Sequence, residues 1–144
     1  WIVIQQRVDG SLSFNQSWNA YKTGFGNHYK NFWLGLEKMH QLTKSADYSL
    51  RFEVLINGVW YSDEYDHFKT NSKPEKYSLN VSGYSGSKDD ILNYQTAYFH
   101  NGMKFSTPDQ DNDQYVNHSC ALKYSSGNWF NKCYYQNLNG PYGS

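Results

Sequence analysis

Three carboxylates stand at alternate positions in this chain, Asp109, Asp111 and Asp113. Like charges a few ångströms apart repel each other, so such a loop is stabilised when a cation lies among its carboxylates. Hard oxygen ligands of this kind suit Ca²⁺. The alternative is an Asx-rich turn whose carboxylates face solvent. The spacing therefore favours Ca²⁺ as the cofactor and leaves the polar turn open.

Two cysteines, Cys120 and Cys133, follow the carboxylates closely. A disulfide between them would close a short loop and stabilise the fold by roughly 3 kcal/mol in the chain-entropy model. Two reduced, buried thiols are the alternative. A zinc site is not favoured, because no Cys-x-x-Cys pair or matching histidine pair accompanies them. A calcium loop beside a disulfide would place the protein outside the cell, where both are stable.

Bulk composition excludes several classes of protein. The formal net charge is +0 and the 13 Lys and Arg residues are scattered, so we expect no nucleic-acid partner. The aromatic content of 19% argues against disorder, and 144 residues suit one domain. No apolar run reaches 18 residues, so we expect no membrane insertion. The chain opens on strand-like residues rather than a signal peptide, which indicates a mature segment.

Three Asn-x-Ser sequons begin at Asn15, Asn80 and Asn117. Each is a candidate N-glycosylation site, and together with the cysteines and the acidic loop they favour a secreted, extracellular protein.

Catalytic patterns are absent from the sequence. The five histidines form no His-Glu-x-x-His motif, and no Gly-x-x-x-x-Gly-Lys-Ser/Thr loop occurs. We therefore expect a binding protein rather than an enzyme.

Hydrophobic periodicity indicates which elements position these residues. Apolar and polar residues alternate in four segments, and two others have the spacing of short helices. The predicted strands span residues 1–8, 48–56, 59–65 and 76–83, and the predicted helices span 17–22 and 36–43. Asn57 and Gly58 predict a hairpin turn. After about residue 84 the pattern fades, and we expect loops held by a ligand and a disulfide rather than by a large core. The aromatic residues Trp1, Trp18, Phe32, Trp33 and Phe52 are the expected core.

Residues spread over the whole chain, and in the same order, resemble the fibrinogen C-terminal domain family, which includes ficolins, tachylectins, angiopoietins and tenascins. The resemblance rests on Trp1 to Arg7, Asp9 to Ser11, Phe14, Trp18, Tyr21, Lys22, Gly24 to Gly26, Phe32 to Gly35, Leu50, Arg51, Gly102 to Thr107, Asp109, Asp111 to Asp113, Cys120, Ala121, Trp129, Cys133 and Asn137 to Gly140.

The resemblance implies a single α+β domain over residues 1–144. A twisted antiparallel sheet with short helices would span about residues 1–95, and a loop-rich calcium- and ligand-binding lobe about 96–144. Members of the family normally have a small N-terminal subdomain, and a C-terminal tail that adds a strand to the sheet and part of the pocket. The resemblance covers neither segment.

For the acidic loop, the resemblance implies that Asp111 and Asp113 bind Ca²⁺ through their side chains. The backbone carbonyls near Tyr115 and Asn117 would complete the shell with water, and Asp109 would be a weaker or outer ligand. The loop does not follow the EF-hand pattern, because a glutamine and a cysteine stand where that motif needs glycine and glutamate.

In lectin-like relatives a pocket beside this loop takes the acetyl group of N-acetylated sugars. The resemblance places Tyr124, Trp129 and Phe130 at its walls and a cis peptide between Lys132 and Cys133. Trp129 and Phe130 have local core packing as their alternative. Tyr134 stands where sugar- and peptide-binding relatives commonly have histidine, and a phenol is larger and does not titrate near neutrality.

These observations favour a secreted, calcium-dependent lectin for acetylated glycans, as in innate immunity. The alternative is a module that binds a cell-surface receptor or a matrix protein, and a third reading is a knob receptor in clotting or adhesion. Relatives assemble through N-terminal stalks, so we expect an oligomer in the full-length protein.

Overall fold

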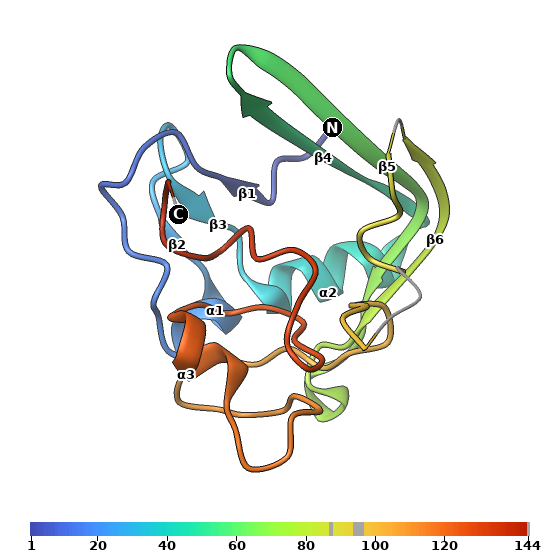
Figure 1. Ribbon diagram of the computed structural model, residues 1–144. Helices are drawn as coiled ribbons and strands as arrows, with labels where there is room; N and C mark the ends of the chain where they lie inside the picture. The colour runs from blue at the N-terminus through green and yellow to red at the C-terminus, as the bar shows by residue number, and fades with distance from the viewer. Residues whose placement is uncertain (87, 94–96, 144) are drawn as a thin grey trace.

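Two antiparallel sheets carry the strands of the computed structural model, which describes residues 1–86, 88–93 and 97–143 (Figure 1). The first has the order β1-β3-β2 and is made of the short strands β1 (Gln5–Gln6), β2 (Phe25–Gly26) and β3 (Phe32–Trp33). The second has the order β4-β5-β6 and is made of β4 (Tyr48–Ile56), β5 (Val59–Thr70) and β6 (Leu79–Gly86).

The helices begin and end where local chemistry allows. Helix α1 (Trp18–Thr23) begins after Ser17, whose side chain accepts the Ala20 N–H, and ends at Gly24 with φ of 100°. Helix α2 (Leu36–Ser45) buries one face, and α3 (Cys120–Tyr124) begins after Ser119, whose side chain caps it. A 3₁₀ turn, η1 (Lys73–Glu75), precedes β6. The structure confirms both predicted helices, and α3 was not predicted.

The strand predictions agree best where a turn fixes the register. The hairpin of β4 and β5 turns at Asn57 and Gly58, with Ile56 opposite Val59. Strand β5 continues beyond its predicted end to Thr70, and β6 begins three residues later than predicted, at Leu79. The prediction of a strand over residues 1–8 was wrong, because only Gln5–Gln6 pairs with β3.

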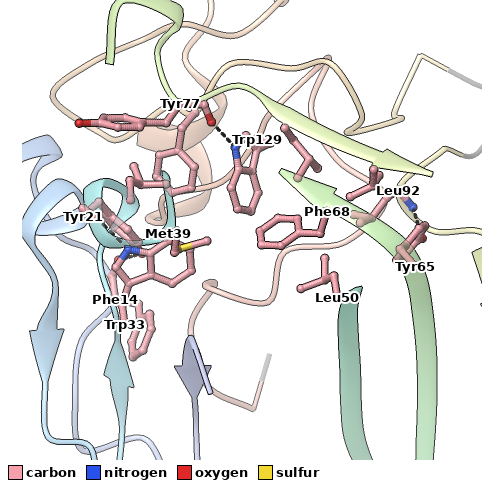
Figure 2. Close-up of a cluster of buried hydrophobic side chains, with 14 residues drawn as sticks. Phe14, Tyr21, Trp33, Met39, Leu50, Tyr65, Phe68, Tyr77, Leu92 and Trp129 are labelled. Carbon is pink, nitrogen blue, oxygen red and sulfur yellow. Dashed lines mark hydrogen bonds between the residues drawn. The ribbon is translucent and has the colours of Figure 1, made fainter. Parts of the chain in front are cut away.

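One aromatic core joins the second sheet to α1, to α2 and to the late part of the chain (Figure 2). Phe105 and Trp129 pack against Trp33, with ring centroids 5.9 and 6.3 Å away. The expectation that residues after 84 lack a large core was therefore wrong for these side chains. The expected core position of Trp1 was also wrong, because Trp1 is 80% exposed.

The outer end of the β4–β5 hairpin has no buried face. Alternation predicted one core face along both strands, yet Val54, Leu55, Ile56, Val59 and Trp60 are all exposed. The predicted boundary between the sheet and the lobe, near residues 95 and 96, lies outside the described residues.

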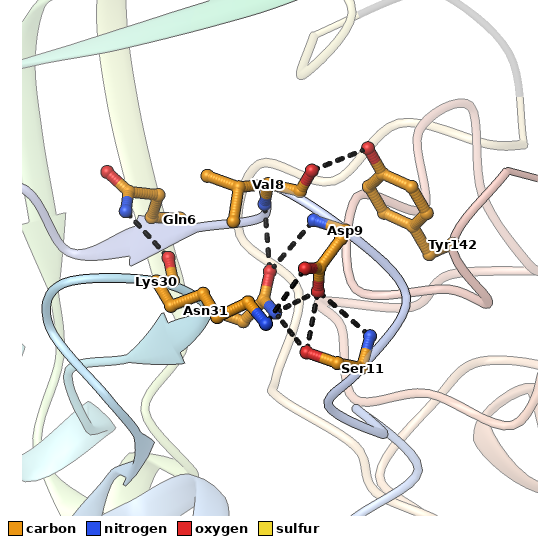
Figure 3. Close-up of polar contacts among 7 residues, drawn as sticks. All are labelled: Gln6, Val8, Asp9, Ser11, Lys30, Asn31 and Tyr142. Atoms are coloured by element: carbon orange, nitrogen blue, oxygen red, sulfur yellow. Dashed lines mark hydrogen bonds and ion pairs between the residues drawn. The ribbon is translucent and has the colours of Figure 1, made fainter.

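A polar network fixes the segment that follows β1 (Figure 3). The side-chain oxygen of Asn31 accepts the N–H groups of Val8 and Asp9 at 2.8 and 3.2 Å, and its amide donates to Asp9 at 2.7 Å. Hydrogen bonds from Ser11, and then from Asn31 and Lys30, hold the pKa of Asp9 well below its usual range. The Tyr142 hydroxyl donates to the Val8 carbonyl at 3.1 Å, which joins the C-terminal segment to this network.

Candidate functional site

A hollow of about 510 Å³ opens between α3 and the segment that follows the second cysteine. Its volume falls within the range of small-molecule sites. One side comes from α3 and Ser125, and the other from the loop that follows Cys133. The lining residues are Lys123, Tyr124, Ser125, Tyr134, Asn137 and Pro141.

Two tyrosines face each other at this hollow. The rings of Tyr124 and Tyr134 meet edge to face with centroids 4.8 Å apart, a favoured geometry for aromatic pairs. The ammonium group of Lys123 lies 5.2 Å from the centroid of the Tyr124 ring. The site thus offers an aromatic surface, two phenol hydroxyls and one cation.

The disulfide holds the two sides of the hollow together. Cys120, the first residue of α3, is bonded to Cys133, whose Cα atom lies 5.5 Å from its own. The structure thus confirms this pair and shows the expected cis peptide between Lys132 and Cys133. Tyr134 follows directly, so the disulfide positions it against Tyr124.

His100 holds the backbone that follows Tyr134. Its Nδ1 donates to the Trp129 carbonyl at 2.9 Å, and its Nε2 accepts the N–H groups of Tyr135 and Gln136, each at 3.1 Å. A ring that accepts at one nitrogen and donates at the other is neutral. Burial lowers the pKa of His100 to about 4, which keeps it neutral at physiological pH.

The far wall, Asn137 and Pro141, is held from β1. Gln5 donates to the Leu138 carbonyl at 3.2 Å and to the Asn139 side chain at 3.0 Å. Within the wall, Ser126 Oγ donates to Asn137 Oδ1 at 2.8 Å.

The predicted wall residues Trp129 and Phe130 lie in the core, where their alternative placed them. Trp129 is 9% exposed and donates its indole N–H to the Tyr77 carbonyl, and Phe130 is fully buried with its ring centroid 6.1 Å from that of Tyr134. Their contribution is to support Tyr134 and the core, and neither lines the hollow. Lys132 is exposed and Cys133 is buried.

The acidic loop brings two of its carboxylates together. The Asp113 N–H donates to Asp111 Oδ1 at 3.1 Å, and Asp113 itself accepts the N–H groups of Tyr115 and Cys120, each at 2.8 Å. Burial, aided by the charge of Asp111, raises the pKa of Asp113 against these two hydrogen bonds. Asn117 has a left-handed backbone with φ of 65°.

Asp109 is engaged elsewhere. Its Oδ1 accepts the Trp18 N–H at the start of α1 and the Thr107 hydroxyl, both at 2.8 Å. Burial acts to raise its pKa, but these hydrogen bonds outweigh it and lower the pKa. The structure thus gives Asp109 a role in holding α1 on the loop.

The donors of this loop fit Ca²⁺ in kind. Ca²⁺ takes six to eight oxygen ligands and accepts carboxylates, backbone carbonyls and water together. Within residues 1–86, 88–93 and 97–143, no three His, Cys, Asp or Glu side chains gather as a metal site. Asp111 and Asp113 could therefore hold the ion only with carbonyls such as those of Tyr115 and Asn117, and with water.

Four lining residues were missed from the sequence, namely Lys123, Ser125, Asn137 and Pro141. A signal was available for Asn137, since it belongs to the stretch up to Gly140 on which the resemblance rests. The three candidate glycosylation residues, Asn15, Asn80 and Asn117, are all exposed.

Comparison with known proteins identifies one family that matches the whole chain. The family model described as "Fibrinogen beta and gamma chains, C-terminal globular domain" matches residues 1–144. Fibroleukin of Bos taurus is 46% identical over 143 residues, which cover 99% of this chain and 32% of that protein. Angiopoietin-4 of Bos taurus is 43% identical over 146 residues, with 99% and 28% covered. The chain thus spans about a third of the length of these relatives.

Solved structures match closely as well. The fibrinogen-like globe domain of human ANGPTL2 has a TM-score of 0.89 at 37% identity and covers 96% of this chain and 62% of that one. The lamprey fibrin D-dimer in complex with the peptide Gly-His-Arg-Pro-amide has a TM-score of 0.90 at 36% identity, with 97% and 48% covered. These matches confirm the predicted α+β fold class.

Proposed function

Because the chain belongs to the fibrinogen C-terminal domain family, we propose that it is a non-catalytic recognition domain that binds a protein ligand at the hollow of Tyr124 and Tyr134. The observation that carries the proposal is the pair of partly buried aromatic rings, which a disulfide and a buried histidine hold in place. Preorganised aromatic side chains are typical anchors of protein interfaces.

A peptide segment is the ligand class that the comparisons favour. The similar lamprey fibrin D-dimer is in complex with Gly-His-Arg-Pro-amide. In this chain the charged lining residue of the hollow is a cation, Lys123. Complementary charge guides recognition, so we infer that the ligand presents a carboxylate and an apolar group rather than an arginine.

An acetylated glycan is the second candidate. The edge-to-face tyrosines would take a methyl group against their faces, and their hydroxyls would donate to an acetyl carbonyl. The relatives and solved structures named above support the protein ligand better, and this reverses the order that the sequence alone suggested.

We further propose that Asp111, Asp113 and neighbouring carbonyls hold Ca²⁺. Bound Ca²⁺ would offset the repulsion between the two carboxylates and fix the loop that leads into α3. Asp113 accepts the N–H of Cys120, the first residue of α3. An ion bound at Asp113 would therefore act on the hollow by positioning α3.

We place the domain outside the cell. Its disulfide suits an oxidising compartment. None of the described helices is long and apolar enough to cross a bilayer. Assembly into an oligomer, expected from the resemblance, remains a prediction about the longer protein.

Calorimetry with defined probes tests the proposed ligand. An acidic peptide with a C-terminal leucine, N-acetylglucosamine and Gly-His-Arg-Pro-amide would be titrated into the protein with and without Ca²⁺. We expect the acidic peptide to bind best, and Tyr134→Ala and Lys123→Ala to weaken it at least tenfold, or about 1.4 kcal/mol. Lys104→Ala, an exposed lysine outside the hollow, is the control. Stronger binding of N-acetylglucosamine would favour the lectin, and no binding of any probe would contradict the site.

A further inference from the structure

Asn80 lies on the outer face of the second sheet. In β6, Leu79 and Val81 are 1% and 2% exposed and point into the core, whereas Asn80 and Ser82 are exposed. Residues two apart along a strand share a face. The asparagine and the serine of this sequon therefore both project away from the core.

A second hollow, of about 310 Å³, lies directly beside Asn80. It shares no lining residue with the hollow at Tyr124 and Tyr134. The end of α2 and the residues after it form one side, and β5 forms the other. The lining residues are Thr43, Ala46, Asp47, His67, Phe68, Lys69 and Asn80.

The polar groups of this hollow suit a sugar. His67 Nδ1 lies 2.9 Å from Asp47 Oδ2, so both a donor and an acceptor are held in place. Lys69 stands opposite Asn80 across the β5–β6 ladder and adds a second donor. Ala46 supplies exposed apolar surface among these polar groups. A sugar ring has an apolar face and a rim of hydroxyls, and such mixed surfaces bind it.

We propose that Asn80 carries an N-linked oligosaccharide whose first N-acetylglucosamine lies in this hollow. The inference rests on the extracellular location proposed above, because the sugar is added along the secretory route. In that step a bond forms between Asn80 Nδ2 and the anomeric carbon of a lipid-linked oligosaccharide. The bond from that carbon to the diphosphate breaks, the diphosphate leaves with the electron pair, and the amide loses one proton.

Asn80 differs from the other two sequon asparagines because it lines this hollow. Asn117 lies in the proposed calcium loop with a left-handed backbone, and Asn15 precedes the cap of α1. The consequence is that a glycan at Asn80 covers the outer face of β5 and β6 and leaves the proposed ligand hollow open.

Mass spectrometry of the protein secreted from eukaryotic cells tests the attachment. We expect the peptide containing Asn80 to carry a hexosamine-based glycan, and Asn80→Gln and Ser82→Ala each to remove it. An unmodified Asn80 with a glycan at Asn15 or Asn117 would overturn this inference and leave the proposed function standing. No glycan at any of the three residues would also overturn the inference, and the ligand-binding tests of the proposed function would be unaffected.

Thermal unfolding of the trimmed wild-type protein and of unglycosylated variants tests the position of the first sugar. An endoglycosidase that leaves one N-acetylglucosamine on Asn80 is expected to keep the melting temperature of the intact glycoprotein. Asn80→Gln and Ser82→Ala, which lack the sugar, are expected to melt about 2–4 °C lower. Asn15→Gln is the matched control, with no such decrease. Equal melting temperatures for the trimmed protein and both unglycosylated variants would overturn the placement of the sugar in the hollow.

Discussion

At the scale of single residues, the three carboxylates of the acidic loop have different surroundings. Asp111 and Asp113 are linked through the Asp113 N–H, whereas Asp109 accepts hydrogen bonds from Trp18 and Thr107. We predict that Ca²⁺ raises the melting temperature, and that Asp111→Asn and Asp113→Asn each abolish this rise because each removes a negative charge from the proposed site.

Asp109→Asn serves as the internal comparison for this prediction. It should retain the Ca²⁺-dependent rise while lowering the stability of the metal-free protein, since the amide accepts the Trp18 N–H less strongly than a carboxylate. Differential scanning calorimetry with Ca²⁺ and with chelator measures both effects. Loss of the Ca²⁺ response in Asp109→Asn would make Asp109 a ligand and contradict the account.

His100 gives the protein a defined dependence on pH. Its pKa is lowered to about 4 in the folded state by burial, against an ordinary value of about 6.5. The unfolded chain therefore binds more protons between these values, so the free energy of unfolding falls as the pH falls from about 6.5 to 4. The full loss is on the order of 3 kcal/mol.

Urea unfolding at pH 7.0 and pH 4.5 measures this loss. The exposed His67, whose pKa is raised by its hydrogen bond with Asp47, acts in the opposite direction, and solvent screening keeps its effect small. A His67→Ala variant removes that contribution and should show a slightly larger loss. If NMR showed the His100 ring titrating near pH 6.5 in the folded protein, the role given to His100 would be wrong.

The sequence predicted the aromatic character of the site correctly, but it predicted only some of the residues that line the hollow. Tyr124 and Tyr134 were expected at the pocket and line the hollow, whereas Trp129 and Phe130 are core residues. An aromatic residue in a loop carries no local signal that separates the wall of a pocket from its support. Lys123, Ser125 and Pro141 were missed because their positions depend on how α3 meets the segment after Cys133.

At the scale of the elements, the segment after β1 depends on one buried side chain. Asn31 is 3% exposed and accepts two backbone N–H groups, those of Val8 and Asp9. We predict that Asn31→Ala lowers the free energy of unfolding by about 1–3 kcal/mol, because both donors lose their partner in a partly buried place.

Denaturant unfolding compares this variant with Asn27→Ala. Asn27 lies in the same β2–β3 connection, and its side chain accepts the Tyr29 N–H at an exposed position. We expect its loss to stay below about 1 kcal/mol. Equal losses for the two variants would show that the buried network contributes nothing specific.

Elements with strong local signals were predicted well. Ser17 and Gly24 bound α1, and Asn57 with Gly58 fixes the β4–β5 register, so neighbouring residues decide these positions. Strand β1 does not continue to residue 8 because the Val8 and Asp9 N–H groups donate to the Asn31 side chain instead of to β3. No local sequence pattern indicates that a distant side chain will take the hydrogen bonds of a strand.

At the scale of the whole molecule, residues far apart in the chain build the main core and support the proposed recognition face. Phe105 and Trp129 pack with Tyr21 and Trp33 from the first third of the chain. Core packing thus attaches the late segment to the rest of the fold, contrary to the sequence-based expectation, and its disulfide links two residues within the segment. A site carried on such a segment is preorganised, which reduces the entropy lost on binding.

The two proposed functions lie on different surfaces of the molecule. The hollow at α3 presents Tyr124, Tyr134 and Lys123 to a ligand, and the outer face of β5 and β6 carries the proposed glycan at Asn80. The two surfaces share no lining residue, so ligand binding and glycosylation can be changed independently.

The most direct test of the central claim is to locate the bound ligand by NMR. The ¹H–¹⁵N spectrum of the Ca²⁺-loaded protein would be followed while the acidic peptide is added. The account predicts that the backbone signals of Tyr124, Ser125, Tyr134 and Asn137 shift together, while those of Lys69 and Asn80 stay in place. Shifts confined to residues outside the α3 hollow, or a saturating interaction that leaves Tyr124 and Tyr134 unmoved, would contradict it.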